Sequence, residues 1–177
     1  MITGNKIILR RQIDEDAAFF ERWYKVPEIM KECAFAQPIT RAELIESFHS
    51  DDASRDWYTI IEKNTGKVIG ETGLLRIDLQ WHRSDLTIIS PDPADQGKGY
   101  GTEAVKLMLQ QAFESHKLNR VALATVAFND KAIDFYKKIG FKQEGIEEQG
   151  FYCNGKFYDF IMFRILRSEY NGGKKND

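Results

Sequence analysis

Apolar and polar residues alternate along much of the first half of the chain, as they do in half-buried β-strands. Residues 6–10 predict a first strand, and residues 57–62 and 67–77 predict an antiparallel pair around an Asn-Thr-Gly turn. Residues 14–24 instead carry apolar side chains at helical spacing, and a capping box from Thr40 to Glu43 predicts a second helix that runs to about His49. The first half therefore predicts one strand, two helices and a strand pair.

The pattern changes in the second half of the chain, where strands and helices alternate. Residues 86–90 form an apolar strand that prolines stop, and residues 102–116 place apolar side chains on one helical face. Residues 120–126 predict another strand. Residues 129–139 predict a helix that starts with an asparagine cap and is followed by glycine. These four elements predict a β-α-β-α unit.

The last predicted element is a hairpin formed by residues 151–153 and 156–164. An Asn-Gly pair separates these two aromatic-rich runs, which is a strong hairpin signal. The predicted order is β-αα-βββ-α-β-α-ββ, and it indicates an α/β (α+β) fold with a central mixed, largely antiparallel sheet flanked by helices. We expect a single domain over residues 1–167 and a polar, frayed tail over residues 168–177.

Charge and composition exclude several classes of protein. The 177 residues carry 25 Lys and Arg against 27 Asp and Glu, a formal net charge of -2. This balance offers no basic stripe for nucleic acid and no polybasic segment for a membrane surface. No apolar signal segment is present, so a cytoplasmic location is expected. Cys33 and Cys153 predict free thiols, and the three histidines have no ligand spacing, so no metal is expected.

The segment with the most specific chemistry is a glycine loop before the helix at 102–116. It reads Gln96-Gly97-Lys98-Gly99-Tyr100-Gly101-Thr102. Glycines let backbone amides approach a ligand closely, and a helix N-terminus adds unpaired N–H groups, so the expected guest is an anion such as a phosphate. A Walker loop needs Ser or Thr after Lys98, and a dinucleotide fingerprint needs glycine in place of Thr102. Neither motif fits.

The loop has the form Gln/Arg-x-x-Gly-x-Gly and resembles the coenzyme A pyrophosphate loop of the GNAT acetyltransferase superfamily. A second similar stretch is the helix that Asn129 caps, which carries Tyr136 and ends in Gly-Phe. The resemblance extends over residues 6–166 and implies a GNAT fold, an acyltransferase, and direct transfer of acetyl from acetyl-coenzyme A to a primary amine. The chain looks nearest to ribosomal-protein N-terminal acetyltransferases and spermidine/diamine N-acetyltransferases.

The resemblance also implies which residues contact the cofactor. The free backbone of the strand at 86–90 would pair with the pantetheine arm, beside a bulge that exposes an amide toward the developing oxyanion. Asn129 would contact the pantetheine arm while it caps its helix. The expected cofactor-binding residues are Ile88, Ile89, Ser90, Gln96, Gly97, Lys98, Gly99, Tyr100, Gly101, Thr102, Asn129 and Tyr136.

Amine acetylation requires a group that takes a proton from the ammonium and a group that protonates the departing thiolate. Tyr136 is the candidate acid, because a phenol with a pKa of about 10 can protonate a developing thiolate; its alternative role is core packing. Asp85 and Glu71 are the candidate bases on central strands, Asp85 acting through a water. Alternatively, Asp85 forms a surface ion pair and Glu71 points outward.

The sequence leaves the acceptor open among a protein or peptide α-amine, a polyamine and another small amine. Spermidine acetyltransferases carry an acidic pair where residues 34–38 of this chain are uncharged, which weakens the polyamine interpretation. A catalytically idle GNAT-fold sensor that binds acyl-coenzyme A is the alternative function. A phosphoryl-transfer enzyme is a third possible function, but the chain lacks the motifs typical of that class. Dimers are frequent among similar proteins, so a homodimer is one expected assembly.

Overall fold

The structure is a computed structural model, and it describes residues 1–170. Eight strands form one sheet in the order β1-β2-β3-β4-β5-β6-β8-β7, in which only β5 and β6 run parallel. The strands are β1 Ile2–Thr3, β2 Ile7–Arg10, β3 Asp56–Glu62, β4 Val68–Asp78, β5 Arg83–Ile89, β6 Arg120–Val126, β7 Lys142–Cys153 and β8 Lys156–Leu166. The predicted mixed, largely antiparallel sheet is confirmed.

Five α-helices flank the sheet in the described part of the chain. They are α1 Ala17–Trp23, α2 Pro27–Glu32, α3 Arg41–Phe48, α4 Tyr100–Gln110 and α5 Asp130–Ile139. A π-helical turn, Gln111–Ser115, continues α4, and short 3₁₀ turns occupy Asp14–Asp16, Pro93–Asp95 and Arg167–Glu169. The predicted order of elements therefore holds, with α2 and the short β1 in addition.

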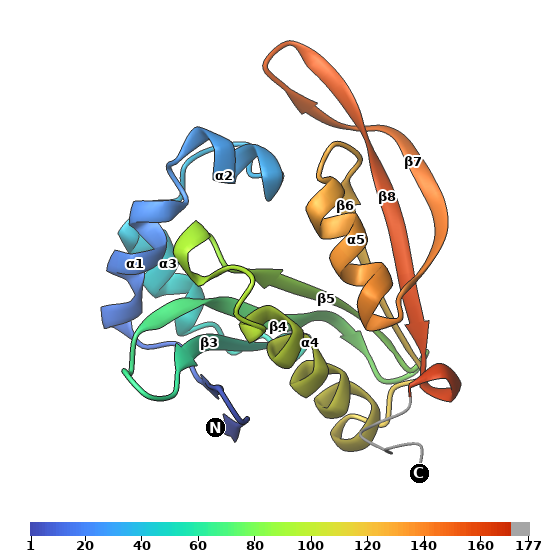
Figure 1. Ribbon diagram of the computed structural model, residues 1–177, viewed down its shortest axis with the longest axis horizontal. Coiled ribbons are helices and arrows are strands. Elements are labelled where there is room, and N and C mark those ends of the chain that lie inside the picture. The colour runs from blue at the N-terminus through green and yellow to red at the C-terminus, as the bar shows by residue number, and fades with distance from the viewer. Residues whose placement is uncertain (171–177) are drawn as a thin grey trace.

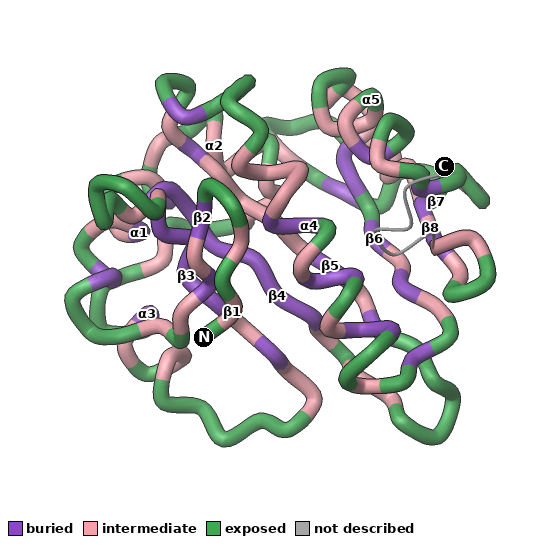
Figure 2. The backbone as a smooth tube through the Cα atoms, turned by 60° about the horizontal axis from the view of Figure 1, so that its bottom comes forward, coloured by how far each residue is buried: buried purple, intermediate pink, exposed green. Residues whose placement is uncertain are grey.

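Two hydrophobic clusters lie on the two faces of the sheet. The larger contains the apolar face of α4 and side chains of α5, packed on buried residues such as Ile7, Tyr58 and Leu74. The smaller joins α1 and α3 through Phe20, Tyr24 and Leu44. Figure 1 shows α4 across one face, and Figure 2 shows burial concentrated on the central strands.

Several boundaries differ from the sequence prediction. Helix α2 was not predicted, although Pro27 at its start is a good first helical residue after the extended Val26. Strand β5 begins at Arg83, and β7 already begins at Lys142. The predicted frayed tail over 168–177 is described only in part: its first residues belong to a 3₁₀ turn, and residues 171–177 lie outside the described residues.

A bulge in β4 decides which side chains of this strand face α1 and α3. The register between β3 and β4 shifts by one residue between Ile60 and Ile61, where Gly70 and Val68 are the successive partners. Such an extra residue reverses the face of the side chains beyond it. Ile69 and Leu74 therefore both belong to the cluster under α4, although they would face opposite sides of a regular strand. Glu71 consequently faces α1.

Two further observations concern residues 1–170 only. No helix in this range is long and apolar enough to cross a membrane. No group of three or more His, Cys, Asp or Glu side chains in the same range is arranged to hold a metal ion.

Candidate active site

The site begins where the two parallel strands separate. Strands β5 and β6 pair only from Arg83 to Asp85, opposite Arg120 to Ala122. Beyond this point β5 stays paired with β4 and β6 stays paired with β8, so their facing backbone edges have no partner strand. Figure 1 shows the two parts of the sheet diverging. An open strand edge can accept an extended ligand through main-chain hydrogen bonds.

This divergence differs from the predicted bulge in the strand before the glycine loop. The pairing of β4 with β5 is regular from Glu71–Ile89 to Leu75–Asp85. The register shift lies at the other end of β5, between Leu75 and Asp78. On the side that faces β6, the edge of β5 opens because β5 and β6 each keep their outer partner strand.

A cavity of about 1000 Å³ occupies the space between the diverging strands and extends toward α1, α2 and α3. Its walls come from four regions: the unpaired end of β5, the glycine loop, α5, and the α1–α3 side of the sheet. Most of the predicted cofactor-binding residues line it, namely Ile88, Ile89, Ser90, Gln96, Gly97, Gly99, Tyr100, Gly101, Thr102, Asn129 and Tyr136. The predicted residue Lys98 does not.

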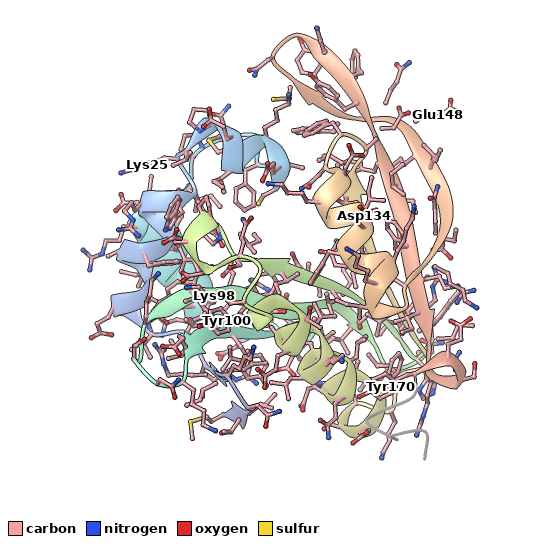
Figure 3. All side chains as sticks on the ribbon, viewed as in Figure 1. Lys25, Lys98, Tyr100, Asp134, Glu148 and Tyr170 are labelled. Atoms are coloured by element: carbon pink, nitrogen blue, oxygen red, sulfur yellow. The ribbon has the colours of Figure 1, made fainter. Side chains whose placement is uncertain are left out.

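The glycine loop adopts the conformation that its glycines allow. Gly97 and Gly99 have φ values of 73° and 87°, in the left-handed region that side-chain-bearing residues rarely adopt. Gly99 immediately precedes α4, so unpaired amides of the first helical turn face the cavity. The carbonyl of Lys98 accepts a hydrogen bond from Lys6 Nζ at 2.8 Å, and its ammonium lies 3.6 Å from Asp95 Oδ1. Figure 3 labels Lys98 and Tyr100 at this end of α4.

Replacement of Gly99 by valine is expected to weaken coenzyme A binding by about tenfold or more, because a β-branched residue disfavours the left-handed backbone that presents the amides. The added Cβ would also lie 3.4 Å from Lys6 Nζ. Isothermal titration calorimetry with coenzyme A measures the effect. Gly66→Val is the matched control, since Gly66 has φ 74° in a turn with nothing near its Cβ. Equal affinities of the two variants would contradict the assigned role of the loop.

Helix α5 holds Tyr136 at the cavity wall. Asn129 caps the helix by accepting a hydrogen bond from the Ala132 amide at 3.1 Å, and Gly140 ends it with φ 114°. The ring of Tyr136 packs against Phe141 and Phe163, and the residue is 7% exposed. Burial raises the pKa of Tyr136 above its ordinary value, so the phenol stays protonated at neutral pH.

Glu71 lies in the same cavity, on the α1 face of β4. Its carboxylate accepts hydrogen bonds from Gln12 Nε2 and Trp57 Nε1, each at 2.8 Å, and from the hydroxyl of Tyr24. The residue is only 6% exposed, and burial raises the pKa of Glu71 although the three donors oppose the shift. A carboxylate with a raised pKa binds a proton more strongly, so it is better suited to act as a general base near neutral pH.

Asp85 lies away from this cavity. It is opposite Leu75 in the sheet, and its carboxylate pairs with the guanidinium of Arg76. Asp85 is not among the residues that line the cavity, whereas Leu75 is. The structure therefore brings Tyr136 and Glu71 into one cavity and leaves Asp85 outside it.

Several cavity residues carried no clear signal in the sequence. Cys33 follows α2 and lines the wall between Glu71 and Tyr136, and burial raises its pKa to about 12, so the thiol is neutral. Gln12 reaches the cavity as a donor to Glu71, and Arg55 reaches it from the start of β3. Each comes from a segment between predicted elements, and only the tertiary fold brings these segments together.

Comparisons with known proteins agree with this architecture. Residues 6–142 match the family model of the acetyltransferase (GNAT) domain. A spermidine N(1)-acetyltransferase of Escherichia coli is 28% identical over 90% of this chain and 80% of its own length. A putative ribosomal N-acetyltransferase of Bacillus subtilis is 37% identical, over 45% of this chain and 43% of its own length.

A solved structure is similar over nearly the whole chain. Spermidine N-acetyltransferase from Vibrio cholerae, in complex with CoA and spermine, superposes with a TM-score of 0.85 at 26% identity. The match covers 93% of this chain and 98% of that one. With the family model matched over most of its length, the chain belongs to the GNAT acetyltransferase family and is an acyltransferase.

Proposed function

We propose that the protein transfers an acetyl group from acetyl-coenzyme A directly to a primary amine bound between α2, α3 and β4. The observation that carries this proposal is the single cavity that joins the glycine loop, the open edge of β5, Tyr136 and Glu71. The family membership and the CoA complex of a similar structure support it.

The residues present fit the chemical groups of coenzyme A. The loop from Gln96 to Thr102 offers backbone amides at a helix N-terminus, which suit a pyrophosphate. A Cβ at Gly97 would meet nothing within 4 Å, which leaves room for a ligand against the backbone there. The edge of β5 from Leu86 to Ile89 has no partner strand on the cavity side, which suits the amides of the pantetheine arm.

Two side chains would carry the proton transfers. In the ionised form, Glu71 accepts a proton from the entering ammonium, so that the amine nitrogen can attack the thioester carbon. As the C–N bond forms and the C–S bond breaks, the Tyr136 phenol donates its proton to the leaving sulfur. The acetylated nitrogen then loses its second surplus proton, which returns through solvent to the Tyr136 phenolate, and Glu71 releases its proton to solvent. Burial supports both assignments because it keeps Tyr136 protonated and raises the proton affinity of Glu71.

The pH profile of kcat is expected to rise with pH and then stay level to about pH 10, because Tyr136 is active when protonated and its pKa is raised above 10. The rise reflects ionisation of Glu71, whose raised pKa moves it above that of an ordinary glutamate. Stopped-time assays of released thiol across this range measure the profile. An alkaline decline near about pH 9 that disappears in Tyr136→Phe would contradict a phenol with a raised pKa.

The acceptor is proposed to enter from the α2–α3 side as a cation. Glu28, Glu32 and Glu43 line this side of the cavity and are exposed. Like-signed carboxylates attract a cationic ligand and raise its local concentration. Two of the similar proteins are named for spermidine, a polycation, which agrees with a cationic acceptor of some kind.

Acetyl-coenzyme A consumption with a panel of polyamines, peptides, amino acids and amino sugars tests the proposed function. Thiol release that depends on one class of amine, together with mass-spectrometric detection of the N-acetyl product, is the expected result. Tight coenzyme A binding with no turnover on any amine would contradict the proposal and favour an acyl-coenzyme A sensor.

A further inference from the structure

A second, smaller cavity adjoins the acceptor side of the first. It has a volume of about 260 Å³ and shares five lining residues with the large cavity: Gln12, Ser47, Phe48, Arg55 and Trp57. Its own further walls include Arg11 and Asp52. The two spaces therefore form one continuous surface, with the polar side chains of the smaller cavity at the end away from the glycine loop.

Arg55 lies in the wall common to both cavities and has no ion-pair partner in the described part of the chain. Its guanidinium stacks over the ring of Trp57, with 4.9 Å from Cζ to the ring centroid. Its Nε is buried and has no hydrogen-bond acceptor. Among residues 1–170, no carboxylate lies within ion-pair distance of Arg55, although Asp52 and Glu71 are near enough for its charge to lower their pKa values. Because Nε is shielded from solvent, an anionic ligand in the cavity would bind the terminal N–H groups of the guanidinium.

The other charged groups of the smaller cavity are already engaged. Arg11 pairs with the buried Asp56 at 2.8 Å and stacks over Tyr58. Asp52 accepts hydrogen bonds from the amide and the hydroxyl of Ser54, at 2.9 and 2.7 Å. Of the two arginines that line this cavity, Arg55 is thus the one without an ion-pair partner among residues 1–170.

The reacting groups Tyr136 and Glu71 line the same large cavity as Arg55. Cys33 is close enough to act on the pKa values of both Tyr136 and Tyr24, and Tyr24 donates to Glu71. Gln12 and Trp57 also donate to Glu71, and both line the smaller cavity beside Arg55. An amine held at Glu71 would therefore lie next to two side chains that also line the smaller cavity with Arg55.

We infer that the acceptor is a small amine whose far end carries an anionic group, a carboxylate or a phosphate, which binds Arg55 in the smaller cavity. This inference rests on the proposed amine acetylation and specifies its substrate class. The exposed glutamates on the α2–α3 side attract the ammonium end, and Arg55 selects the anionic end. A linear polyamine would instead place a second ammonium against an unpaired guanidinium, and like charges repel.

Amines of equal length with different far ends test the inference. The panel is pentylamine, δ-aminovalerate, aminobutyl phosphate and cadaverine, with shorter and longer homologues of each. We measure kcat/KM by thiol release, and binding by calorimetry in the presence of coenzyme A. The carboxylate or the phosphate compound is expected to exceed the neutral amine by about tenfold or more, and the more active of the two identifies the anion.

Variants of Arg55 separate recognition of the anion from general effects on the site. The ratio of kcat/KM for the anionic amine to that for pentylamine is expected to fall close to one in Arg55→Gln and to be partly kept in Arg55→Lys. Any effect of the Arg55 charge on Glu71 changes kcat/KM for both amines by the same factor, so it cancels in this ratio. Arg167→Gln is the matched control, since Arg167 is exposed and lines neither cavity, and it should keep the wild-type ratio.

Two results would overturn the inference. One is a preference for cadaverine over every anionic homologue, and the other is an unchanged ratio in Arg55→Gln. Either result, with acetylation of other amines intact, removes the anion site and leaves the proposed function standing. If no amine of any kind is acetylated, the proposed function itself fails, and the inference fails with it.

Discussion

Tyr136→Phe is expected to lower kcat by about 100-fold or more, because it removes the group that protonates the leaving thiolate and keeps the ring that packs against Phe141 and Phe163. The affinity for coenzyme A should stay within about twofold, since the cofactor is held mainly by backbone amides. Steady-state kinetics and calorimetry on the same preparation separate the two quantities. Tyr152→Phe, on an exposed residue of β7, is the control and should behave as wild type.

A fall in coenzyme A affinity that accounts for the whole loss would give Tyr136 a binding role. Full activity of Tyr136→Phe would remove it from the chemistry and leave it as a packing residue. The burial of its ring against Phe141 and Phe163 is compatible with packing alone, so this variant decides between the two roles.

Glu71→Gln is expected to lower kcat/KM by about 100-fold, because an amide cannot accept the proton of the ammonium. The loss should shrink at high pH, where more of the acceptor is already neutral. Three donors converge on this carboxylate, so the variant also leaves one of them without an acceptor and should lower the free energy of unfolding by about 1–3 kcal/mol. Kinetics as a function of pH and denaturant unfolding measure the two effects.

Asp85→Asn is the matched control for Glu71, since both residues are acidic and lie on neighbouring strands. Asp85 pairs with the exposed Arg76 and does not line the cavity. Its replacement should change kcat/KM by less than about twofold, because exposed ion pairs contribute little. The opposite pattern, a large loss in Asp85→Asn and none in Glu71→Gln, would assign the base to Asp85.

Local signals explain why the glycine loop and α5 could be predicted from sequence. Gly97 and Gly99 occupy left-handed positions that follow directly from their residue type. Asn129 and Gly140 bound α5 through contacts within a few residues. In both segments, the residues that determine the backbone conformation lie close together in the chain, so the sequence motif alone predicts the local structure.

The orientation of Glu71 depends on a feature that the sequence pattern does not reveal. Alternation along β4 assigns Glu71 to one face of the sheet, but the bulge at Gly70 reverses this assignment. The role of Asp85 depends in the same way on where β5 and β6 stop pairing. Arg55 becomes notable only because α3, β3 and the segment after β2 enclose a cavity around it, and such long-range packing leaves no local pattern.

The crystal structure of the protein with coenzyme A tests the central claim most directly. The account predicts pyrophosphate oxygens within hydrogen-bond distance of amides between Gly97 and Thr102, and a pantetheine arm along the open edge of β5 that places its sulfur near the Tyr136 hydroxyl. Coenzyme A bound anywhere else on the molecule, or a sulfur remote from Tyr136, would contradict it.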